Sequence, residues 1–517
     1  MRRGKEEAQR TGASVQHTTR AHAKHVQMPP DARPDDTVTD RIVERDLVAR
    51  NNKNKRRKTD PAAKPNRNQS SMNVLRSFAD LGDGRHPRLS SLTRYDGVCM
   101  GDDLPLLSPG AAYGGNRVAC MLVGGHAGVQ NGGCHLNVLV GSGRHLYELG
   151  CCLGSDGNAS GLERGKGGHV YLPSSDPVTR LYTRVDTLSC RAEIQSVSTA
   201  RGDYGDGSRR VLLTDMYGRG VCGTLSAGDG GVDGGVDGSE HGSRLQLQSM
   251  FPLNPDDSLL CVEGGLTVGD MSNTSSYSAI GRHFPKDVTV FDGDVVVRTF
   301  HTLGSPTDVK LVGDSLVTVA EGNMVTVYDV RIADRQTRVA RLQPVGSTSS
   351  GHIYSLAVRG EQSMGSGGGA ETPGNASCPL LGAGGEDRDV YVWDPRVWKS
   401  VNQWKNCVKY EITSLHFLDS DPRYCVVSGM DYEVACGAWF ENKSKVFTKS
   451  MQALGGKGRA TGPVTEAGSV AEAQRQGRVV ASYRGMSRWI GMSKLEGQDV
   501  FVGVTTDGKV YQSSFSM

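Results

Sequence analysis

Short segments in which apolar and polar residues alternate recur along most of the chain, and turn-forming Gly, Asn or Asp residues separate them. Such alternation predicts β-strands, and the separating residues predict tight turns. The segments come in groups of four. Residues 308–312, 316–320, 325–329 and 339–343 form one group, and the same order returns at 352–404 and at 412–483. The chain is therefore predicted to be all-β and built from repeated four-stranded units.

One of these groups carries additional motifs. His352 precedes its first strand, and a Gly/Asp turn that contains Asp387 leads into a strand that ends in Trp393-Asp394. With these motifs the chain resembles the WD-repeat family, in which four-stranded blades form a β-propeller. The resemblance implies a single β-propeller of about seven four-stranded blades. It also implies that His352, Asp387, Trp393 and Asp394 form a structural network that fixes the turns of their blade.

The last repeat predicts how the ring would close. Residues 488–493, 500–505 and 509–514 supply three strands, and the chain ends soon afterwards. A closed ring needs a fourth strand there, which we expect from an N-terminal segment near residues 72–100. Closure of this kind removes the exposed strand edges that an open ring would present.

Composition divides the chain into two parts. Residues 1–70 contain no Phe, Trp or Tyr and are predicted to be a disordered basic arm, whereas residues 71–517 are predicted to form the propeller. Segments rich in Gly and small polar residues interrupt the strand pattern, and we interpret them as loop insertions at 154–168, 227–243, 267–283, 360–378 and 441–477. All five Trp residues lie between 393 and 489 and are expected to pack between blades.

Charge and cysteine content bear on the location of the protein. The formal net charge is +3, but the arm is strongly basic and the rest of the chain is mildly acidic. The 12 cysteines show no Cys-x-x-Cys spacing, and no stretch is apolar enough to cross a membrane. We expect no membrane association and a nuclear or cytoplasmic location, with the nucleus favoured.

A compact basic cluster lies within the arm and consists of Lys53, Lys55, Arg56, Arg57 and Lys58. Such a cluster is read as a nuclear import signal or as a contact for a polyanion. The alternative is a solvated run of charge that keeps the arm extended. If the cluster binds polyanions, the chain is a nucleic-acid-associated factor, and that binding would weaken steeply with added salt.

Two neighbouring groups end in similar tetrapeptides, Tyr328-Asp-Val-Arg331 and Trp393-Asp-Pro-Arg396. WD-repeat substrate receptors of cullin-RING ubiquitin ligases have a similar Trp-Asp-x-Arg ending, whose Arg binds an adaptor propeller. The resemblance makes Arg331 and Arg396 candidate partner-binding residues, because Arg offers a planar fork for bidentate contacts. The alternative is that each Arg pairs with a carboxylate beside it.

The motifs of common enzymes are missing from the sequence. There is no phosphate-binding loop, no His-Glu-x-x-His pair, no Gly-x-Ser-x-Gly elbow and no kinase motif set. We therefore expect no catalytic, cofactor or metal site. The function that the sequence favours is a non-enzymatic scaffold for an intracellular protein complex, with a ligase substrate receptor and a nucleic-acid factor as alternatives.

Overall fold

The computed structural model describes fifteen ranges of the chain, all of them within one compact unit of residues 67–517. These ranges are 86–99, 115–122, 134–153, 163–164, 170–172, 178–185, 190, 192–201, 208–227, 245–252, 265–332, 337–344, 351–359, 379–440 and 479–517. Every regular element within them is a β-strand, and the strands are numbered β1 to β30.

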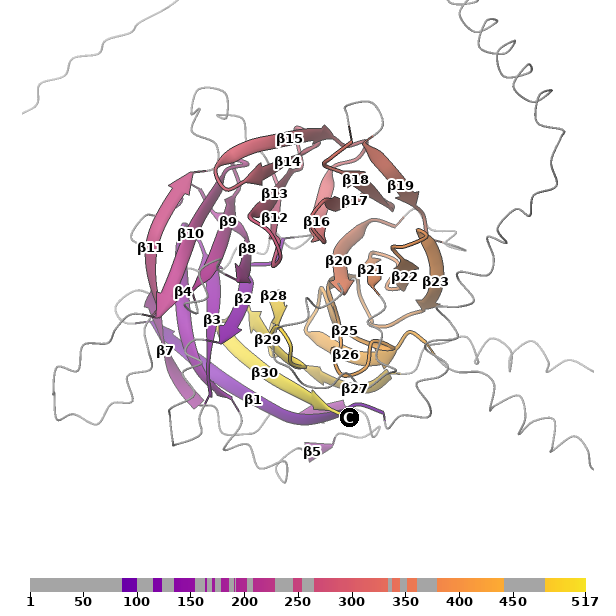
Figure 1. The fold of residues 1–517 in the computed structure, drawn as a ribbon. Helices are drawn as coiled ribbons and strands as arrows, with labels where there is room; N and C mark the ends of the chain where they lie inside the picture. The colour runs from indigo at the N-terminus through magenta and orange to yellow at the C-terminus, as the bar shows by residue number, and fades with distance from the viewer. Residues whose placement is uncertain are drawn as a thin grey trace, which may run out of the picture. The chain divides into compact units, whose positions relative to one another are not determined.

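Seven four-stranded antiparallel sheets stand around a common axis, so the fold is a seven-bladed β-propeller (Figure 1). From the innermost strand outward, the first three blades are β2 (Val118–Leu122), β3 (Cys134–Ser142), β4 (His145–Leu153) and β7 (Val178–Arg184); β8 (Ile194–Arg201), β9 (Arg209–Asp215), β10 (Gly220–Ala227) and β11 (Leu245–Pro252); and β12 (Thr267–Met271), β13 (Tyr277–Arg282), β14 (Asp287–Asp292) and β15 (Val295–His301).

The remaining four blades follow the same order from the axis outward. They are β16 (Pro306–Val312), β17 (Leu316–Glu321), β18 (Met324–Asp329) and β19 (Arg338–Leu342); β20 (Ile353–Arg359), β21 (Leu380–Gly385), β22 (Val390–Asp394) and β23 (Lys399–Trp404); β24 (Ile412–Phe417), β25 (Tyr424–Gly429), β26 (Glu433–Ala438) and β27 (Val479–Arg484); and β28 (Trp489–Lys494), β29 (Val500–Thr505), β30 (Lys509–Ser516) and β1 (Arg88–Cys99).

The ring is closed by β1, which is the outermost strand of the last blade. It pairs antiparallel with β30, from Arg88 opposite Ser516 to Asp96 opposite Lys509. The predicted closing strand from the N-terminal part of the chain is therefore confirmed. Closure satisfies backbone groups of β30 that would otherwise form an open sheet edge.

One further pairing joins two neighbouring blades at their outer edges, and another adds strands to the outer edge of one blade. The end of β1 pairs in parallel with β7, from Tyr95 opposite Val178 to Cys99 opposite Tyr182. The short strands β5 (Glu163–Arg164) and β6 (Val170–Leu172) add to the blade on the other side of β1, where β6 pairs in parallel with β27. The chain between β4 and β7 therefore reaches the outer edges on both sides of the closing blade.

The hydrophobic core lies mainly between blades. Each blade buries β-branched and aromatic residues against the next one, as when Phe300 of β15 stacks on Tyr328 of β18 with ring centroids 4.9 Å apart. The predicted packing of the Trp residues is confirmed for the four that are buried: Trp393, Trp404, Trp439 and Trp489. Burial of such large side chains supplies much of the hydrophobic stabilisation.

Two predicted loop insertions need correction. Residues 267–283 are not a loop, because they contain β12 and β13, the two inner strands of the third blade. The range 154–168 includes β5, which is part of a sheet. The insertions predicted at 227–243, 360–378 and 441–477 lie outside the described residues, apart from Ala227 at the end of β10. The predicted arm, residues 1–70, also lies outside them.

Candidate partner-binding site

The two candidate arginines lie at the same end of the propeller. Because strands in a blade are antiparallel, the turn after the first strand and the turn after the third strand are at one end. Arg331 follows β18 and Arg396 follows β22, each the third strand of its blade. Neighbouring blades therefore present an arginine from equivalent turns.

An aspartate two residues earlier holds each of these arginines. Asp329 accepts a hydrogen bond from the backbone N–H of Arg331 at 2.9 Å and bonds from its guanidinium at 3.1 and 2.9 Å. Asp394 binds Arg396 in the same way, at 3.0, 3.1 and 3.2 Å. These contacts bear out the alternative interpretation of a neighbouring carboxylate partner.

Pairing leaves both guanidinium groups accessible. The side chain of Arg331 is 73% exposed and that of Arg396 is 49% exposed, whereas their aspartate partners are 7% and 2% exposed. The hydrogen bonds from Arg331 hold the pKa of Asp329 below its ordinary value. A buried carboxylate thus orients an exposed, planar cation, which is a geometry suited to binding a carboxylate or a carbonyl of a partner.

The four residues of the predicted blade network lie around one blade. Trp393 and Asp394 are buried at the end of β22, and the Trp393 ring packs 6.0 Å from that of Tyr391. The carboxylate of Asp387 accepts hydrogen bonds from the Tyr391 hydroxyl and from the backbone N–H of Asp389. Burial raises the pKa of Asp387 above its ordinary value.

His352 lies at the corner where this blade begins. Its backbone N–H donates to Glu386 at 2.9 Å, and its exposed ring stacks on Tyr354. The ladder contact at this corner is tight, since a Cβ on Gly385 would lie 1.9 Å from the His352 carbonyl oxygen. The described contacts of these residues hold turns in place, and none of them has the geometry of a reactive centre.

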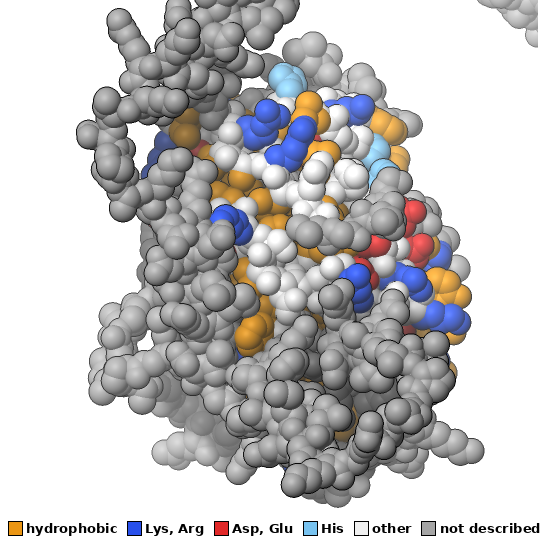
Figure 2. Space-filling model, turned by 90° about the vertical axis from the view of Figure 1, so that its right-hand side faces the viewer, with side chains coloured by type: hydrophobic (Ala, Val, Ile, Leu, Met, Phe, Trp, Pro, Cys, Tyr) orange, Lys and Arg blue, Asp and Glu red, His pale blue; other side chains and the backbone are white. Residues whose placement is uncertain are grey.

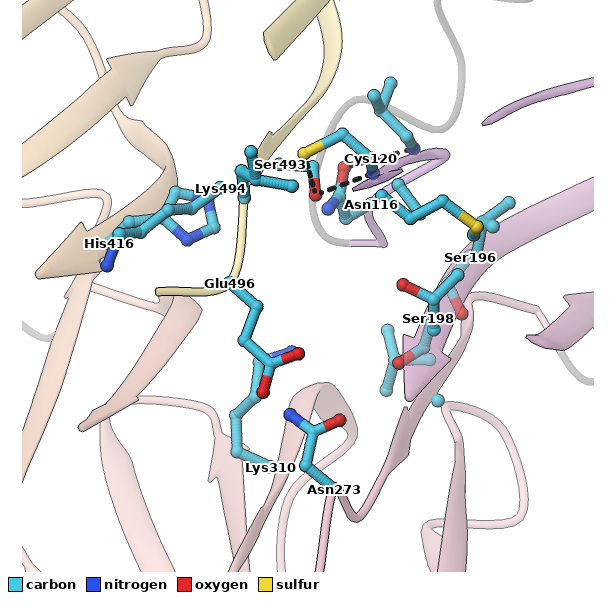
Figure 3. A pocket seen from close by; sticks show the side chains of 18 of the residues that line it. Asn116, Cys120, Ser196, Ser198, Asn273, Lys310, His416, Ser493, Lys494 and Glu496 are labelled. Atoms are coloured by element: carbon cyan, nitrogen blue, oxygen red, sulfur yellow. Dashed lines mark hydrogen bonds between the residues drawn. The ribbon is translucent and has the colours of Figure 1, made fainter. Parts of the chain in front are cut away.

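The innermost strands line a polar cavity of about 190 Å³ at the axis (Figure 3). Its two lysines are held by carboxylates. The Lys310 amine lies 3.2 Å from Asp270 and 3.9 Å from Asp308, and these two negative charges raise its pKa although burial opposes that shift. Lys494 lies 2.5 Å from Asp419 and 3.8 Å from Asp499.

Two titratable groups that line the cavity, His416 and Cys120, have pKa values shifted toward their neutral forms. Burial lowers the pKa of His416 to about 3, and the nearby Lys494 and Lys310 add to this effect, so the imidazole is neutral. Burial raises the pKa of the Cys120 thiol to about 12, and its sulfur lies 3.4 Å from the Ser493 hydroxyl. Burial thus disfavours the thiolate form of Cys120, which is the nucleophilic form of a cysteine.

Sequence reasoning missed this cavity entirely. Two of its charged residues alternate along one inner strand, in Asp308-Val-Lys310, so the strand period places them on one face of that strand without showing that the face lines a cavity. Within the described ranges, no cluster of three His, Cys, Asp or Glu side chains is arranged to hold a metal. The same ranges contain no helix with the length and apolarity needed to cross a bilayer.

The basic cluster from Lys53 to Lys58 lies outside the described residues, and its role stays a prediction.

The chain was compared with known families, curated proteins and solved structures. No family model and no curated protein matches the chain. Among solved structures, the crystal structure of Chaetomium thermophilum Raptor is similar at 9% sequence identity and a TM-score of 0.46. The similarity covers 89% of this chain and 31% of that one, so this chain spans about a third of the length of Raptor. The strand topology of the chain itself defines its class, which is that of the seven-bladed β-propellers.

Proposed function

We propose that this protein is a non-enzymatic scaffold of the WD-repeat type that assembles a protein complex. The observation that carries the proposal is the pair of exposed arginines, Arg331 and Arg396, which buried aspartates hold in equivalent turns of neighbouring blades. A closed ring of blades fixes the positions of such turns, so a partner meets a preorganised surface. The folded chain uses neither arginine to fill its core.

A substrate receptor of a cullin-RING ubiquitin ligase is the more specific version of this function. It is favoured by the Trp393-Asp-Pro-Arg396 ending, in which the Arg is directed by its own Asp and remains half-exposed. In this version Arg396 binds the adaptor propeller and Arg331, in the next blade, extends the contact. The opposite end of the ring is then available for the substrate.

The experiment is quantitative affinity purification of the full-length chain from cells, followed by mass spectrometry. The wild type is compared with Arg331→Ala/Arg396→Ala and with Lys405→Ala, which removes an exposed cation that follows β23 at the other end of the same blade. We expect a set of proteins that the double variant loses and the Lys405 variant keeps.

The outcomes separate the two versions. If the lost set includes a ligase adaptor, the receptor function is supported. If it contains other proteins and no adaptor, the scaffold stands and the receptor falls. Recovery of the same proteins with all three chains would contradict the role of the two arginines.

A further inference from the structure

Within the described residues, the outermost strands of the seven blades differ in whether they pair with a further strand on their outer side. The outermost strands β1 and β7 pair with each other, and β27 is paired with β6. By contrast, β15 pairs with β14 alone. The molecule therefore adds strands to the outer edges of some of its blades, and β15 presents the same kind of edge without such a strand.

The first half of β15 is unusually apolar for an exposed strand. Val295, Val296 and Val297 are 63%, 51% and 41% exposed, so both faces of this segment are accessible. A register shift opposite Phe291 interrupts the pairing with β14 there. The other half of the strand is anchored, because Phe300 is buried and stacks on Tyr328. In β15, the C-terminal half is thus packed against the neighbouring blade, and the N-terminal half presents exposed apolar side chains.

Basic residues lie beside this end on β15 and β19, whereas two exposed carboxylates, Asp292 and Asp294, precede it in the chain. Arg298 of β15 donates to the backbone carbonyl of Ile332, which lies in the turn before β19, and so joins the two blades. On β19, Arg338, Val339 and Arg341 are all exposed. Together β15 and β19 carry three arginines and no carboxylate. Figure 2 shows basic side chains next to apolar ones on the upper part of this side of the molecule, where β15 and β19 lie in Figure 1.

We propose that the β15 edge binds an extended acidic segment of a partner protein, which adds as a fifth strand to the third blade. Backbone groups of Val295 to Arg298 supply the hydrogen bonds, and apolar side chains of the segment pack on the valines. Acidic residues at the alternate positions of the segment pair with arginines of β15 and β19.

Two comparisons within the chain favour this occupant. The pairing of β6 with β27 shows that a strand as short as three residues joins an outer edge of this propeller. The outer strand β23 is polar along most of its length, with Ser400, Asn402 and Gln403, so it offers fewer apolar side chains on which an added strand could pack. Compared with β23, the β15–β19 side is apolar and basic. The proposal rests on the scaffold function and names one kind of partner for it.

The experiment measures binding of fluorescent peptides to the purified full-length protein. The probe is a short peptide of alternating Val and Glu with blocked ends. One control peptide alternates Val and Lys, and another is the Val/Glu peptide with alternate backbone nitrogens methylated, so that it cannot donate ladder hydrogen bonds. We expect the Val/Glu peptide to bind at least about tenfold more tightly than either control.

Three variants test the location. Val296→Asp is expected to weaken binding by about tenfold or more, because it replaces an apolar side chain on the edge with a negative charge that repels an acidic segment. Ser400→Asp makes a matched change on β23 and should leave binding unaltered. Arg338→Glu/Arg341→Glu should reverse the preference toward the Val/Lys peptide. Thermal melting of each variant checks that the fold is retained.

Each other outcome overturns the proposal. Equal binding of the three peptides, no binding of the Val/Glu peptide, or equal losses in the Val296 and Ser400 variants would remove the edge as a peptide site. Sedimentation of the wild type as a dimer that Val296→Asp dissociates would assign the edge to a second copy of this chain. Either failure leaves the purification with the Arg331 and Arg396 variants untouched, so the scaffold function is judged separately.

Discussion

A single residue pair recurs at the turns of this propeller. Asp329 with Arg331, Asp394 with Arg396, and Asp421 with Arg423 share one geometry, in which the carboxylate accepts from the backbone N–H and from the guanidinium of the Arg two residues on. The aspartates are buried in all three pairs. The exposed fraction of the Arg falls from 73% and 49% to 11% in the third. The Asp is therefore the structural member, and the Arg contributes to binding only where it is exposed.

This division predicts different effects for the two halves of a pair. Asp394→Ala should lower the free energy of unfolding by about 1–3 kcal/mol, because it leaves the N–H of Arg396 without its buried acceptor. Arg396→Ala should cost less than about 1 kcal/mol, since the ion pair is half-exposed. Urea unfolding of the full-length variants gives both values. A larger loss for the Arg variant would contradict the assignment.

The cavity histidine gives a prediction on pH. The folded protein lowers the pKa of His416 from 6.5 to about 3. Between these two pH values, His416 binds a proton in the unfolded chain and stays neutral in the folded chain. The contribution of His416 to the free energy of unfolding is therefore complete above pH 6.5 and is lost as the pH falls toward 3. Within that window the loss is at most about 1.4 kcal/mol per pH unit.

His416→Gln isolates this effect. Glutamine does not titrate, and its amide can donate to the Met492 carbonyl that His416 contacts at 3.2 Å. The difference in unfolding free energy between the wild type and the variant, measured by urea unfolding at several pH values, should therefore change steadily below pH 6.5 and stay constant above it. A pH-independent difference would mean that the imidazole is not held neutral.

At this scale the sequence predicted packing better than it predicted sites. The structural role of Trp393 and Asp394 is predicted from their match to the blade motif of the WD-repeat family, and both residues are buried. Lys310 and His416 were missed, because strand periodicity shows that a residue faces inward without showing that several blades converge on one cavity. The convergence of several blades on one cavity depends on how the ring closes.

The segment that forms the inner strands β12 and β13 is predicted from its composition to be a loop, and this prediction is wrong. Their segment is rich in Gly and Ser, a composition typical of a loop. The glycines are there because adjacent blades approach closely. A Cβ on Gly269 would lie 2.8 Å from a Thr214 methyl group, and one on Gly281 would lie 2.8 Å from a Val309 methyl group. Small residues thus reflect interblade packing, a long-range constraint that local composition does not reveal.

The packing of β1 against β7 can be tested by adding a methyl group where the two strands meet. A Cβ on Gly97 of β1 would lie 1.9 Å from the ring of Tyr182, whose hydroxyl donates to the Gly508 carbonyl at 3.0 Å. Gly97→Ala should therefore lower the unfolding free energy by about 1–3 kcal/mol. Gly150→Ala is the matched control, because nothing lies within 4 Å of its added methyl group. Equal stabilities of the two variants in thermal melts would show that β1 and β7 are not packed together.

The parallel pairings could not have been predicted from the segments that make them. The closing strand was expected because a count of strands left one blade with three. The addition of β6 to β27 and of β7 to β1 depends on where the chain passes after leaving β4, and that path is set by the finished ring. Strand periodicity identifies a strand but does not identify its neighbour.

Over the whole molecule, closure should make unfolding cooperative. Every Trp lies between residues 393 and 489, so Trp fluorescence reports on the last three blades, whereas far-ultraviolet circular dichroism reports on all seven. If the ring unfolds as a unit, the two signals give the same urea midpoint. Two separated midpoints, in the wild type, would show that the early and late blades unfold independently.

The position of β1 in the sequence determines which of its two partner strands is synthesised first. Residues 88–99 are made early, yet their antiparallel partner is residues 509–516. Until residues 509–516 leave the ribosome, β1 can form the other of its two ladders within the described residues, the one with β7, which is complete once residue 182 has been made. The parallel strand can hold the early segment in place through the synthesis of five further blades, so that it is already aligned when the final hairpin arrives.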